Sequence, residues 1–490
     1  MFGLTVSSIA AVAAVTIATL LFYFYQRFVR PLSFFKRMNI PGPKPKLFFG
    51  SAFDEVYGGH LGQVRCIKEF GNVYGALLGP KPVLIVADPD MLRDIFVKHF
   101  STFPNRYAVI PPAPGFDRNL LVIEDDDWKR VRSVLIPTFS SAKLKQLESI
   151  MCDACDRLVD NLIKTDRENG KIDFKKACGE YSMEVIMAAA FGVDLTSDVR
   201  GQKIRHSAST FFTASGLALV AASIFPALFP YLGFLIKDRI HASNHVIQVS
   251  KAIIAERRRN LKQGLTNRRD LLQLMIEAAD NDKITDDEIV SQSFIFLLAG
   301  YETTANALSY TFYLLATNPD AQQRLIDEID EKCPKGTQIT TELISDLPYL
   351  DMVINESLRI YPPAYIVNRV TKNDIILNGI SIPKNLTIAI PIYGIHHNEK
   401  LWPDPEKFIP ERFTPEAKAK RHPFAHVPFG NGPRNCIGMR LAIIEAKLAL
   451  VKVLQNVVVK AVDDTQIPLR VNAQLTLSAV DGVILGVKER

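Results

Sequence analysis

A single cysteine, Cys436, stands in a glycine-punctuated loop, residues 429–438, that leads into an apolar helical pattern over residues 437–454. A thiol at a helix entrance lies near unpaired backbone N–H groups and the positive end of the macrodipole, which stabilise its thiolate. Gly430 and Gly432 allow the chain to wrap around the sulfur and aim N–H groups at it. The loop therefore predicts a thiolate ligand for a soft metal. A buried structural cysteine in a glycine-rich turn is the alternative.

The other cysteines give no sign of a disulfide ladder. Cys152 and Cys155 have the spacing of a redox or zinc pair, but no second pair follows and both fall in a helical pattern over residues 143–163. We expect two ordinary helix-borne thiols. Six unpaired cysteines fit a reducing, cytosol-facing compartment.

The longest helical pattern begins at Thr285, which can form a capping box with Glu288, and ends before Asn318-Pro319. Such a helix is about 48 Å long and can cross an entire domain. Its apolar centre contains the run Ala-Gly-Tyr-Glu-Thr-Thr at residues 299–304. An acid and hydroxyls inside an apolar helix conflict with burial, and such conflicts mark functional sites. Hydroxyls that bond back to helix carbonyls are the alternative.

These two blocks resemble the signatures of the cytochrome P450 superfamily. The first matches Phe-x-x-Gly-x-Arg-x-Cys-x-Gly and the second matches Ala/Gly-Gly-x-Asp/Glu-Thr-Thr/Ser. The resemblance implies haem b with an axial thiolate from Cys436. It also implies cofactor contacts from Phe429, Arg434 and Gly438, room for dioxygen over the ring beside Ala299 and Gly300, and proton delivery by the catalytic pair Thr303 and Glu302.

Haem propionates need cations in a semi-buried setting, and bidentate arginine suits them. Trp128 and Arg132 lie one turn apart in a Trp-x-x-x-Arg pattern, and Arg369 follows a Tyr-Pro-Pro turn on a predicted strand. The resemblance makes these three, with Arg434 and Arg106, the candidate propionate-side residues. Taken alone, each of these arginines is more often a solvated surface residue.

Three further charged residues resemble a structural motif of the superfamily. Glu356 and Arg359 form the Glu-x-x-Arg pattern, and Arg412 lies in a Pro-Glu-Arg-Phe segment. The resemblance implies that their ions lock together on the proximal side and retain the cofactor. On sequence grounds alone, Glu356 and Arg359 could be a surface ion pair.

The fold class that follows is mainly α with small β-sheets, the cytochrome P450 fold behind an N-terminal transmembrane helix. Strand signals are short: residues 83–86, residues 375–382 around Asn378-Gly379, and a C-terminal pair around Asp481-Gly482. With 490 residues, 48% of them apolar, and no linker or repeat, the chain predicts one large domain. We divide it into an anchor over residues 1–26, a basic and Pro-rich hinge over 27–46, and a haem-thiolate catalytic domain over 47–490.

The N-terminus predicts a membrane anchor. Residues 2–25 carry no charge and are long enough to span a bilayer, and Arg27, Arg30, Lys36 and Arg37 follow at once. Positive charge on this side predicts that the catalytic domain faces the cytosol, and the resemblance implies the endoplasmic reticulum membrane. A cleaved signal peptide is the alternative.

A second uncharged stretch covers residues 207–236. Gly216, Pro226, Pro230 and Gly233 interrupt it, and basic residues flank both sides. We expect two short apolar helices that dip into the membrane surface and roof the pocket. A true span and a plain core segment are the alternatives. With residues 107–121, Phe294 and residues 364–367, this stretch predicts a cavity for a lipophilic guest.

The resemblance implies a microsomal haem-thiolate monooxygenase of the drug- and steroid-oxidising clan that includes thromboxane synthase. It would insert one oxygen atom from dioxygen into a steroid, fatty acid or xenobiotic, with NADPH electrons delivered by NADPH-cytochrome P450 reductase. Cytochrome b5 is a second candidate partner. A net charge of +6 is too diffuse to predict nucleic-acid binding. The docking candidates are Lys129, Arg130, Lys143, Lys418, Lys420, Arg421 and Arg440. For any one of them, a solvated surface position is the alternative.

Two rival functions remain open at this point. An isomerase of the thromboxane-synthase type would rearrange a hydroperoxide or endoperoxide without external electrons, but such enzymes typically depart from the acid-Thr pattern that Glu302 and Thr303 preserve. A membrane-tethered haem sensor would have no use for that pair.

Overall fold

A computed structural model describes residues 6–51, 59–108, 115–192, 204, 206–208, 210–211, 237–265 and 270–490. The predicted roof over residues 207–236 therefore lies largely outside the described residues, as do residues 110–114 of the predicted cavity lining.

The body of the molecule is built around the long central helix α13, Asp286–Thr317. The Thr285 side chain accepts a hydrogen bond from the Glu288 N–H, and the Glu288 carboxylate accepts one from the Thr285 N–H, so the predicted capping box is present. Pro319 ends the helix and begins α14, Pro319–Lys332. The predicted length and both ends are confirmed because each boundary has a strong local signal.

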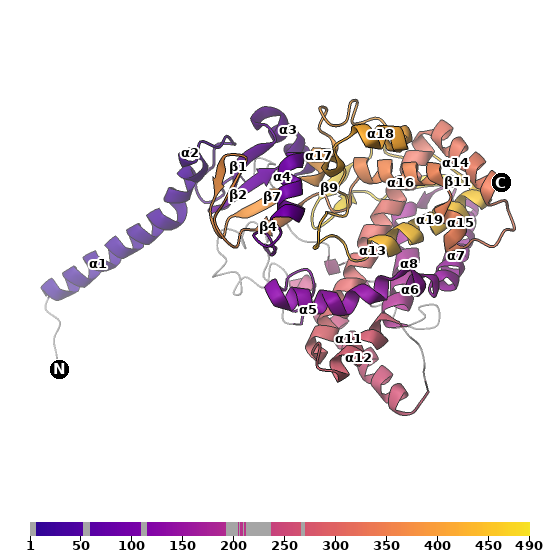
Figure 1. The fold of residues 1–490 in the computed structure, drawn as a ribbon, viewed down its shortest axis with the longest axis horizontal. Coiled ribbons are helices and arrows are strands. Elements are labelled where there is room, and N and C mark those ends of the chain that lie inside the picture. The colour runs from indigo at the N-terminus through magenta and orange to yellow at the C-terminus, as the bar shows by residue number, and fades with distance from the viewer. Residues whose placement is uncertain are drawn as a thin grey trace.

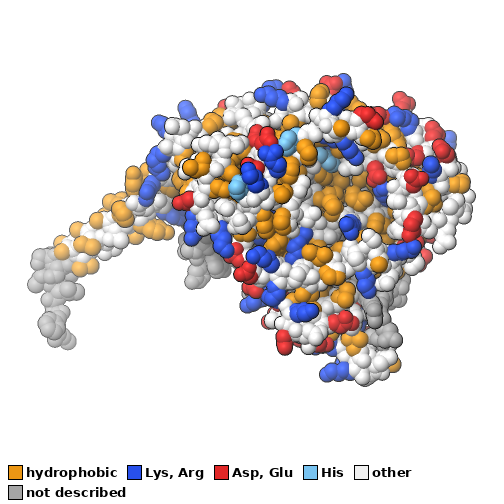
Figure 2. Space-filling view, in the orientation of Figure 1, with side chains coloured by type: hydrophobic (Ala, Val, Ile, Leu, Met, Phe, Trp, Pro, Cys, Tyr) orange, Lys and Arg blue, Asp and Glu red, His pale blue; other side chains and the backbone are white. Residues whose placement is uncertain are grey.

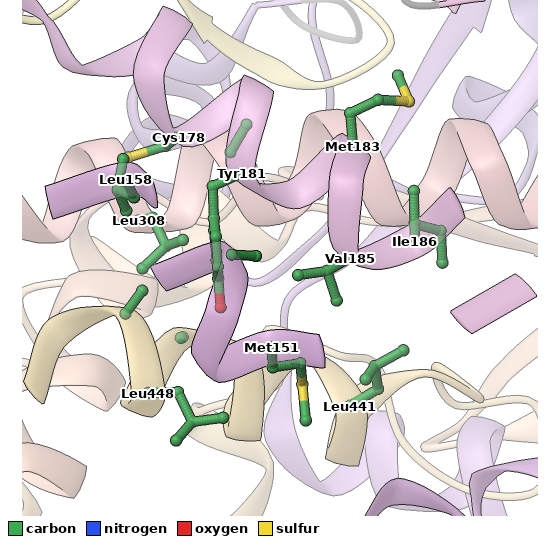
Figure 3. Close-up of a cluster of buried hydrophobic side chains, with 14 of the residues drawn as sticks. Met151, Leu158, Cys178, Tyr181, Met183, Val185, Ile186, Leu308, Leu441 and Leu448 are labelled. Carbon is green, nitrogen blue, oxygen red and sulfur yellow. The ribbon is translucent and has the colours of Figure 1, made fainter. Parts of the chain in front are cut away.

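Helices α7, Glu148–Asn169, α8, Phe174–Ile186, and α19, Met439–Asn456, pack with α13 into the main apolar core. Figure 3 shows side chains of these helices converging, among them Met151, Tyr181, Leu308 and Leu448. The predicted helix over residues 143–163 is instead divided at Gln146-Leu147 into α6, Ser141–Lys145, and α7. This core joins α19 to α13.

The remaining helical segments surround this core (Figure 1). The α-helices are α3 His60–Phe70, α4 Pro89–Arg93, α5 Asp125–Leu135, α11 Lys237–Lys262, α12 Leu271–Asp280, α15 Thr341–Ser345, α16 Pro348–Ile360, α17 Ile392–His396 and α18 Pro415–Lys420. Short 3-10 or π segments are η4 Asp94–Lys98, η5 Ile136–Phe139, η6 Met187–Phe191, η8 Pro410–Phe413 and η9 Pro423–Ala425.

A four-stranded sheet lies at the end of the body nearest the N-terminus (Figure 1). Its order is β1 Val73–Leu78, β2 Lys81–Val86, β7 Thr387–Ile390 and β4 Val367–Val370, and only the β2–β7 pair is parallel. Strands β5 Ile375–Leu377 and β6 Ile380–Ile382 form the predicted hairpin. Asn378 and Gly379, with φ of 49° and 77°, give it the two left-handed turn residues that a two-residue hairpin needs.

The C-terminal strands do not form the predicted pair around Asp481-Gly482. Strand β10, Leu477–Ala479, pairs with β9, Val471–Ala473, while β11, Ile484–Glu489, pairs with β8, Val457–Lys460, and β3, Ile172–Asp173. The connection turns around Asp173, whose carboxylate accepts a hydrogen bond from the Val483 N–H. At Gly482, φ is 79°, and a Cβ would lie 2.8 Å from that carboxylate. The turn signal was therefore real, but it joins two different sheets.

The N-terminal helix α1, Val6–Phe24, projects from the body as a rod (Figure 1). It continues through η1 Tyr25–Val29, η2 Arg30–Ser33 and α2 Phe34–Arg37. Residues 10–37 are the one stretch among the described residues that is long and apolar enough to cross a membrane. The Pro-rich segment that follows is tied to the sheet, since the Gly75 N–H donates to the Pro41 carbonyl at 2.8 Å.

Candidate active site

The cysteine loop is held by backbone contacts that depend on its glycines. Gly430 and Gly432 have φ of 67° and 72°, and a Cβ at Gly432 would collide with the carbonyl oxygen of Phe96. The Cys436 N–H donates to the Phe429 carbonyl at 2.9 Å, which closes the loop. Gly438 is the N-cap residue of α19. The sulfur is thereby fixed at the helix entrance, as its sequence position predicted.

Cys436 differs from the other cysteines in its surroundings. Of the six cysteines, all of which the structure describes, only Cys436 is exposed. Its thiol nevertheless lies deep among protein atoms, and this burial raises its pKa, while the Gly438 N–H and the guanidinium groups of Arg106 and Arg132 oppose the rise. A thiol that keeps solvent contact inside a protein and lies near two cations can serve as a metal ligand.

Four arginines gather around this loop, and the described residues place no carboxylate within 4 Å of any of them. Arg434 donates to the carbonyls of Pro104 and Ile123, Arg106 donates to the Arg434 carbonyl, and Arg132 donates to the Asn435 carbonyl and amide oxygens. Arg369 donates to the neighbouring Asn368 carbonyl.

The cluster is strongly desolvated. The Arg369 and Arg434 side chains are buried, and the Nε atoms of Arg106, Arg369 and Arg434 have no hydrogen-bond partner. Burial lowers the pKa of Arg106 to about 10 and that of Arg434 to about 9, and it places that of Arg369 well below its usual value. Buried cations without anionic partners are costly. The site therefore fits a ligand that brings carboxylates of its own.

Trp128 provides an apolar wall for the same cluster. It is buried, its indole N–H has no partner, and its ring lies 5.0 Å from the Arg434 guanidinium and 5.6 Å from that of Arg132. An indole N–H is a donor only, so it also suits an added acceptor. Haem fits this set of side chains. Its iron takes a thiolate, and its two propionates carry one negative charge each, which suits the four arginines and the indole N–H. Sequence analysis selected every one of these residues.

At the centre of α13, Ala299 and Thr303 lie on one face of the helix, while Gly300 packs against a neighbouring helix. Ala299 is exposed although it lies near the middle of α13. The Thr303 hydroxyl donates to the Ala299 carbonyl at 2.6 Å, so these two residues share one face of the helix. Gly300 lies against α8, where a Cβ would come 2.7 Å from Ile186. Its small size is thus required by helix packing. The predicted role of Ala299 and Gly300 in leaving room over the ring stays a prediction.

Glu302 does not lie beside Thr303 in space, although the two are adjacent in sequence. Its buried carboxylate contacts Asn306 Nδ2 at 3.3 Å, Ser478 Oγ at 3.4 Å and Lys175 Nζ at 3.8 Å. Adjacent helical residues diverge by about 100°, and Glu302 therefore points toward α8 and β10. Lys175 and Ser478 were missed in the sequence because no local pattern brings α8 and β10 to α13.

Glu356, Arg359 and Arg412 meet as the resemblance implied. Glu356 binds Arg359 through two hydrogen bonds of 2.7 and 2.8 Å and Arg412 through one of 3.2 Å. The Glu356 and Arg359 side chains are 0% exposed, which excludes a surface ion pair. Arg359 also donates to the carbonyls of His396 and Lys407. The motif therefore joins α16 to the segment that precedes the cysteine loop.

Two of the predicted docking cations, Arg130 and Arg421, make structural contacts. Arg130 binds both carboxylate oxygens of Glu288, the N3 residue of α13, and one oxygen of Asp127. Arg421 lies over the rings of Trp402 and Phe413. These engagements remove Arg130 from the set of readily available surface cations and tie Arg421 to the core.

Comparisons with known proteins agree with this geometry. The family model described as Cytochrome P450 matches residues 40–484. The chain is 38% identical over 483 residues to cytochrome P450 3A25 of Mus musculus, with 96% of this chain and 95% of that protein covered. It is also 38% identical over 486 residues to cytochrome P450 3A5 of Homo sapiens, with 97% and 95% covered. The chain belongs to the cytochrome P450 family and is a haem-thiolate monooxygenase.

Proposed function

We propose that the protein inserts one oxygen atom from dioxygen into a lipophilic substrate at the endoplasmic reticulum membrane, with electrons from NADPH through NADPH-cytochrome P450 reductase. The observation that carries this proposal is the accessible thiol of Cys436 beside buried arginines whose described partners are carbonyl and amide oxygens. Haem bound there supplies the reductive activation of dioxygen. The remaining tasks belong to the side chains of this chain.

The cysteine loop and the arginines are proposed to hold the cofactor. Cys436 would bind the iron, and its position at the start of α19 would stabilise the thiolate through the Gly438 N–H. Arg106, Arg132, Arg369 and Arg434 would bind the propionates, which replaces the missing anionic partners of four cations. Trp128, Phe429 and Gly438 complete this contact set, the first through its unpaired indole N–H.

Ala299 and Thr303 are proposed to form the distal face. The Thr303 hydroxyl already donates its proton to the Ala299 carbonyl, so its oxygen would accept a hydrogen bond from a water molecule. Glu302 would act from behind the helix as a proton reservoir. Its contacts with Asn306, Ser478 and Lys175 are all long, at 3.3, 3.4 and 3.8 Å, so a change of rotamer toward Thr303 gives up only weak contacts.

The lipophilic substrate class is supported by an aromatic cluster ahead of the distal face. Phe116, Phe211 and Phe294 come from three separate segments, and their ring centroids are 4.8 to 5.5 Å apart. Phe294 lies on α13, five residues before Ala299. Aromatic side chains of this kind favour guests with a large apolar surface. Steroids, fatty acids and xenobiotics all satisfy that condition.

Reconstitution distinguishes this proposal from the isomerase alternative. The full chain is combined with NADPH-cytochrome P450 reductase and a panel of steroids, fatty acids and xenobiotics under isotopically labelled dioxygen. We expect one labelled oxygen atom in the product, and none when NADPH is omitted. Turnover of a hydroperoxide or endoperoxide without NADPH, with no labelled product from any substrate, would establish the isomerase instead. Cytochrome b5 is proposed as a second electron donor, and raised product yield on its addition tests that role.

A further inference from the structure

The chain directly after α1 carries a dense group of positive charges. Residues 1–51 contain six lysines and arginines, all between positions 27 and 46, and no aspartate or glutamate. Among the described residues, no carboxylate lies within 4 Å of Arg27, Arg30, Lys36, Arg37 or Lys44. Figure 2 shows these cations gathered where the projecting helix joins the body. Such a surface attracts an anionic partner.

This segment is fixed to the body rather than loosely hinged. Phe48 packs against Phe24 and Phe28 with centroid distances of 5.9 and 5.1 Å, so the end of α1 is held by the turn before Gly50. Gly42 passes so close to Gly75 of β1 that a Cβ would collide with the Gly75 carbonyl oxygen. The cations are therefore held at a fixed height relative to both α1 and the sheet.

A seventh cation from the sheet joins the group. Lys81, at the start of β2, is half-buried, and its Nζ lies 2.9 Å from the centroid of the Tyr107 ring. Burial lowers its pKa to about 8. Burial raises the pKa of Tyr107 and the nearby charge of Arg27 opposes that rise, so Arg27 and Lys81 both lie close to Tyr107. A half-buried cation on an aromatic face, with no carboxylate within 4 Å among the described residues, is suited to a further anionic contact.

Apolar side chains extend the same surface toward the membrane. Leu47 and Phe49 are 40% and 38% exposed, and Tyr25, directly after α1, is 53% exposed. Aromatic and apolar residues next to cations are typical of the level at which lipid headgroups lie. The partner is therefore expected to combine negative charge with an apolar layer, which an acidic soluble protein does not offer.

We propose that Arg27, Arg30, Lys36, Arg37, Lys44 and Lys81 form a basic collar that binds the headgroups of anionic phospholipids. The proposal rests on α1 spanning the membrane. Because the collar is rigid, this binding would set the tilt of the four-stranded sheet, and with it of the whole catalytic domain, on the bilayer. Clusters of four to eight cations beside a membrane span are typical of such lipid recognition.

Lysine acylation read by mass spectrometry tests the collar in the full-length holoprotein. The protein is placed in nanodiscs of phosphatidylcholine alone or with added phosphatidylserine. We expect labelling of Lys36, Lys44 and Lys81 to fall about threefold in the anionic discs, because a negative surface raises the local proton concentration by about that factor. High salt should reverse the change. Lys332, at the end of α14 on the far side of the body, is the internal control (Figure 1).

A triple variant, Arg27→Gln, Arg30→Gln and Arg37→Gln, identifies the cause of the protection. In this variant we expect acylation of Lys36 and Lys81 to be nearly the same in the two kinds of nanodisc. The variant should still resist carbonate extraction and keep its haem. Equal labelling in both kinds of disc would overturn the proposal, and so would protection that appears only when the reductase is added. Extraction of the wild-type protein by carbonate would instead remove the membrane span on which the proposal rests.

Discussion

Replacement of Glu356 by alanine is the change with the largest expected effect outside the cofactor contacts. Its carboxylate accepts two hydrogen bonds from Arg359, one from Arg412 and one from the Ile409 N–H, over distances of 2.7 to 3.2 Å. Neither the Glu356 nor the Arg359 side chain is exposed to solvent. Glu356→Ala therefore leaves a fully buried guanidinium with only the carbonyls of His396 and Lys407 as partners.

The expected cost follows from that uncompensated charge. Removing one partner of a buried ion pair lowers the free energy of unfolding by about 3–5 kcal/mol. Native domains are stable by only about 5–15 kcal/mol, so the variant should be close to unfolding at physiological temperature. The segment before the cysteine loop should also loosen, because Arg412 loses its tie to α16. We expect a large loss of bound haem per polypeptide together with a lower urea midpoint.

A matched control lies in the same segment. Glu411, beside Arg412, pairs with Arg324 on the surface, where the two side chains are 39% and 58% exposed. An exposed pair contributes about 0–1 kcal/mol, so Glu411→Ala should keep both its haem and its urea midpoint. Equal losses in the two variants, or normal haem content and stability in Glu356→Ala, would refute the reasoning.

The other predictions concern the arginine cluster, the distal face and acid stability. Arg434→Met should leave the haem-free protein as stable as wild type or more stable, because it removes a buried cation. Haem should nevertheless transfer from the variant to apomyoglobin about 10- to 100-fold faster, which is the effect of losing one charged hydrogen bond. Slower unfolding without faster haem transfer would contradict this. Thr303→Val should keep NADPH oxidation but lower product per NADPH by about two orders of magnitude, the usual contribution of a positioned group in proton transfer; unchanged coupling in a product assay would exclude the role of Thr303 in holding the proton-transferring water. Burial lowers the pKa of His397 to about 3, while the unfolded chain keeps the usual pKa of 6.5. Between these values His397 binds a proton in the unfolded chain only, so the free energy of unfolding falls as pH drops from about 6.5 to 3. His397→Gln should therefore reduce the slope of unfolding free energy against pH by about 1.4 kcal/mol per unit in that window, as measured by urea titrations; an unchanged slope would show that His397 is not buried neutral.

Features with a local cause were predictable from the sequence. Both ends of α13 follow from a capping box and a proline, and the β5–β6 hairpin follows from Asn378-Gly379. The cysteine loop was predictable for the same reason, since Gly430 and Gly432 allow the positive φ that the loop adopts. In each case the determining contacts lie within a few residues.

Features that depend on distant partners were not predictable. Gly300 faces α8 because Ile186 fills the space beside it, and Glu302 turns toward Lys175 and Ser478, which are more than a hundred residues away in the sequence. Helical periodicity shows which residues share a face but not which neighbour covers that face. The strands around Asp481-Gly482 were misassigned for a similar reason, because a turn signal does not specify which strand each arm will join.

The absorption spectrum of the reduced full-length protein under carbon monoxide tests the central claim, that the Cys436 thiolate binds the haem iron. We predict a strongly red-shifted Soret band in the wild-type protein, and the same band in Cys152→Ser, which alters a half-buried thiol on α7. Cys436→Ser should lose the band. A wild-type spectrum without that shift, or a shifted band that persists in Cys436→Ser, would contradict the claim.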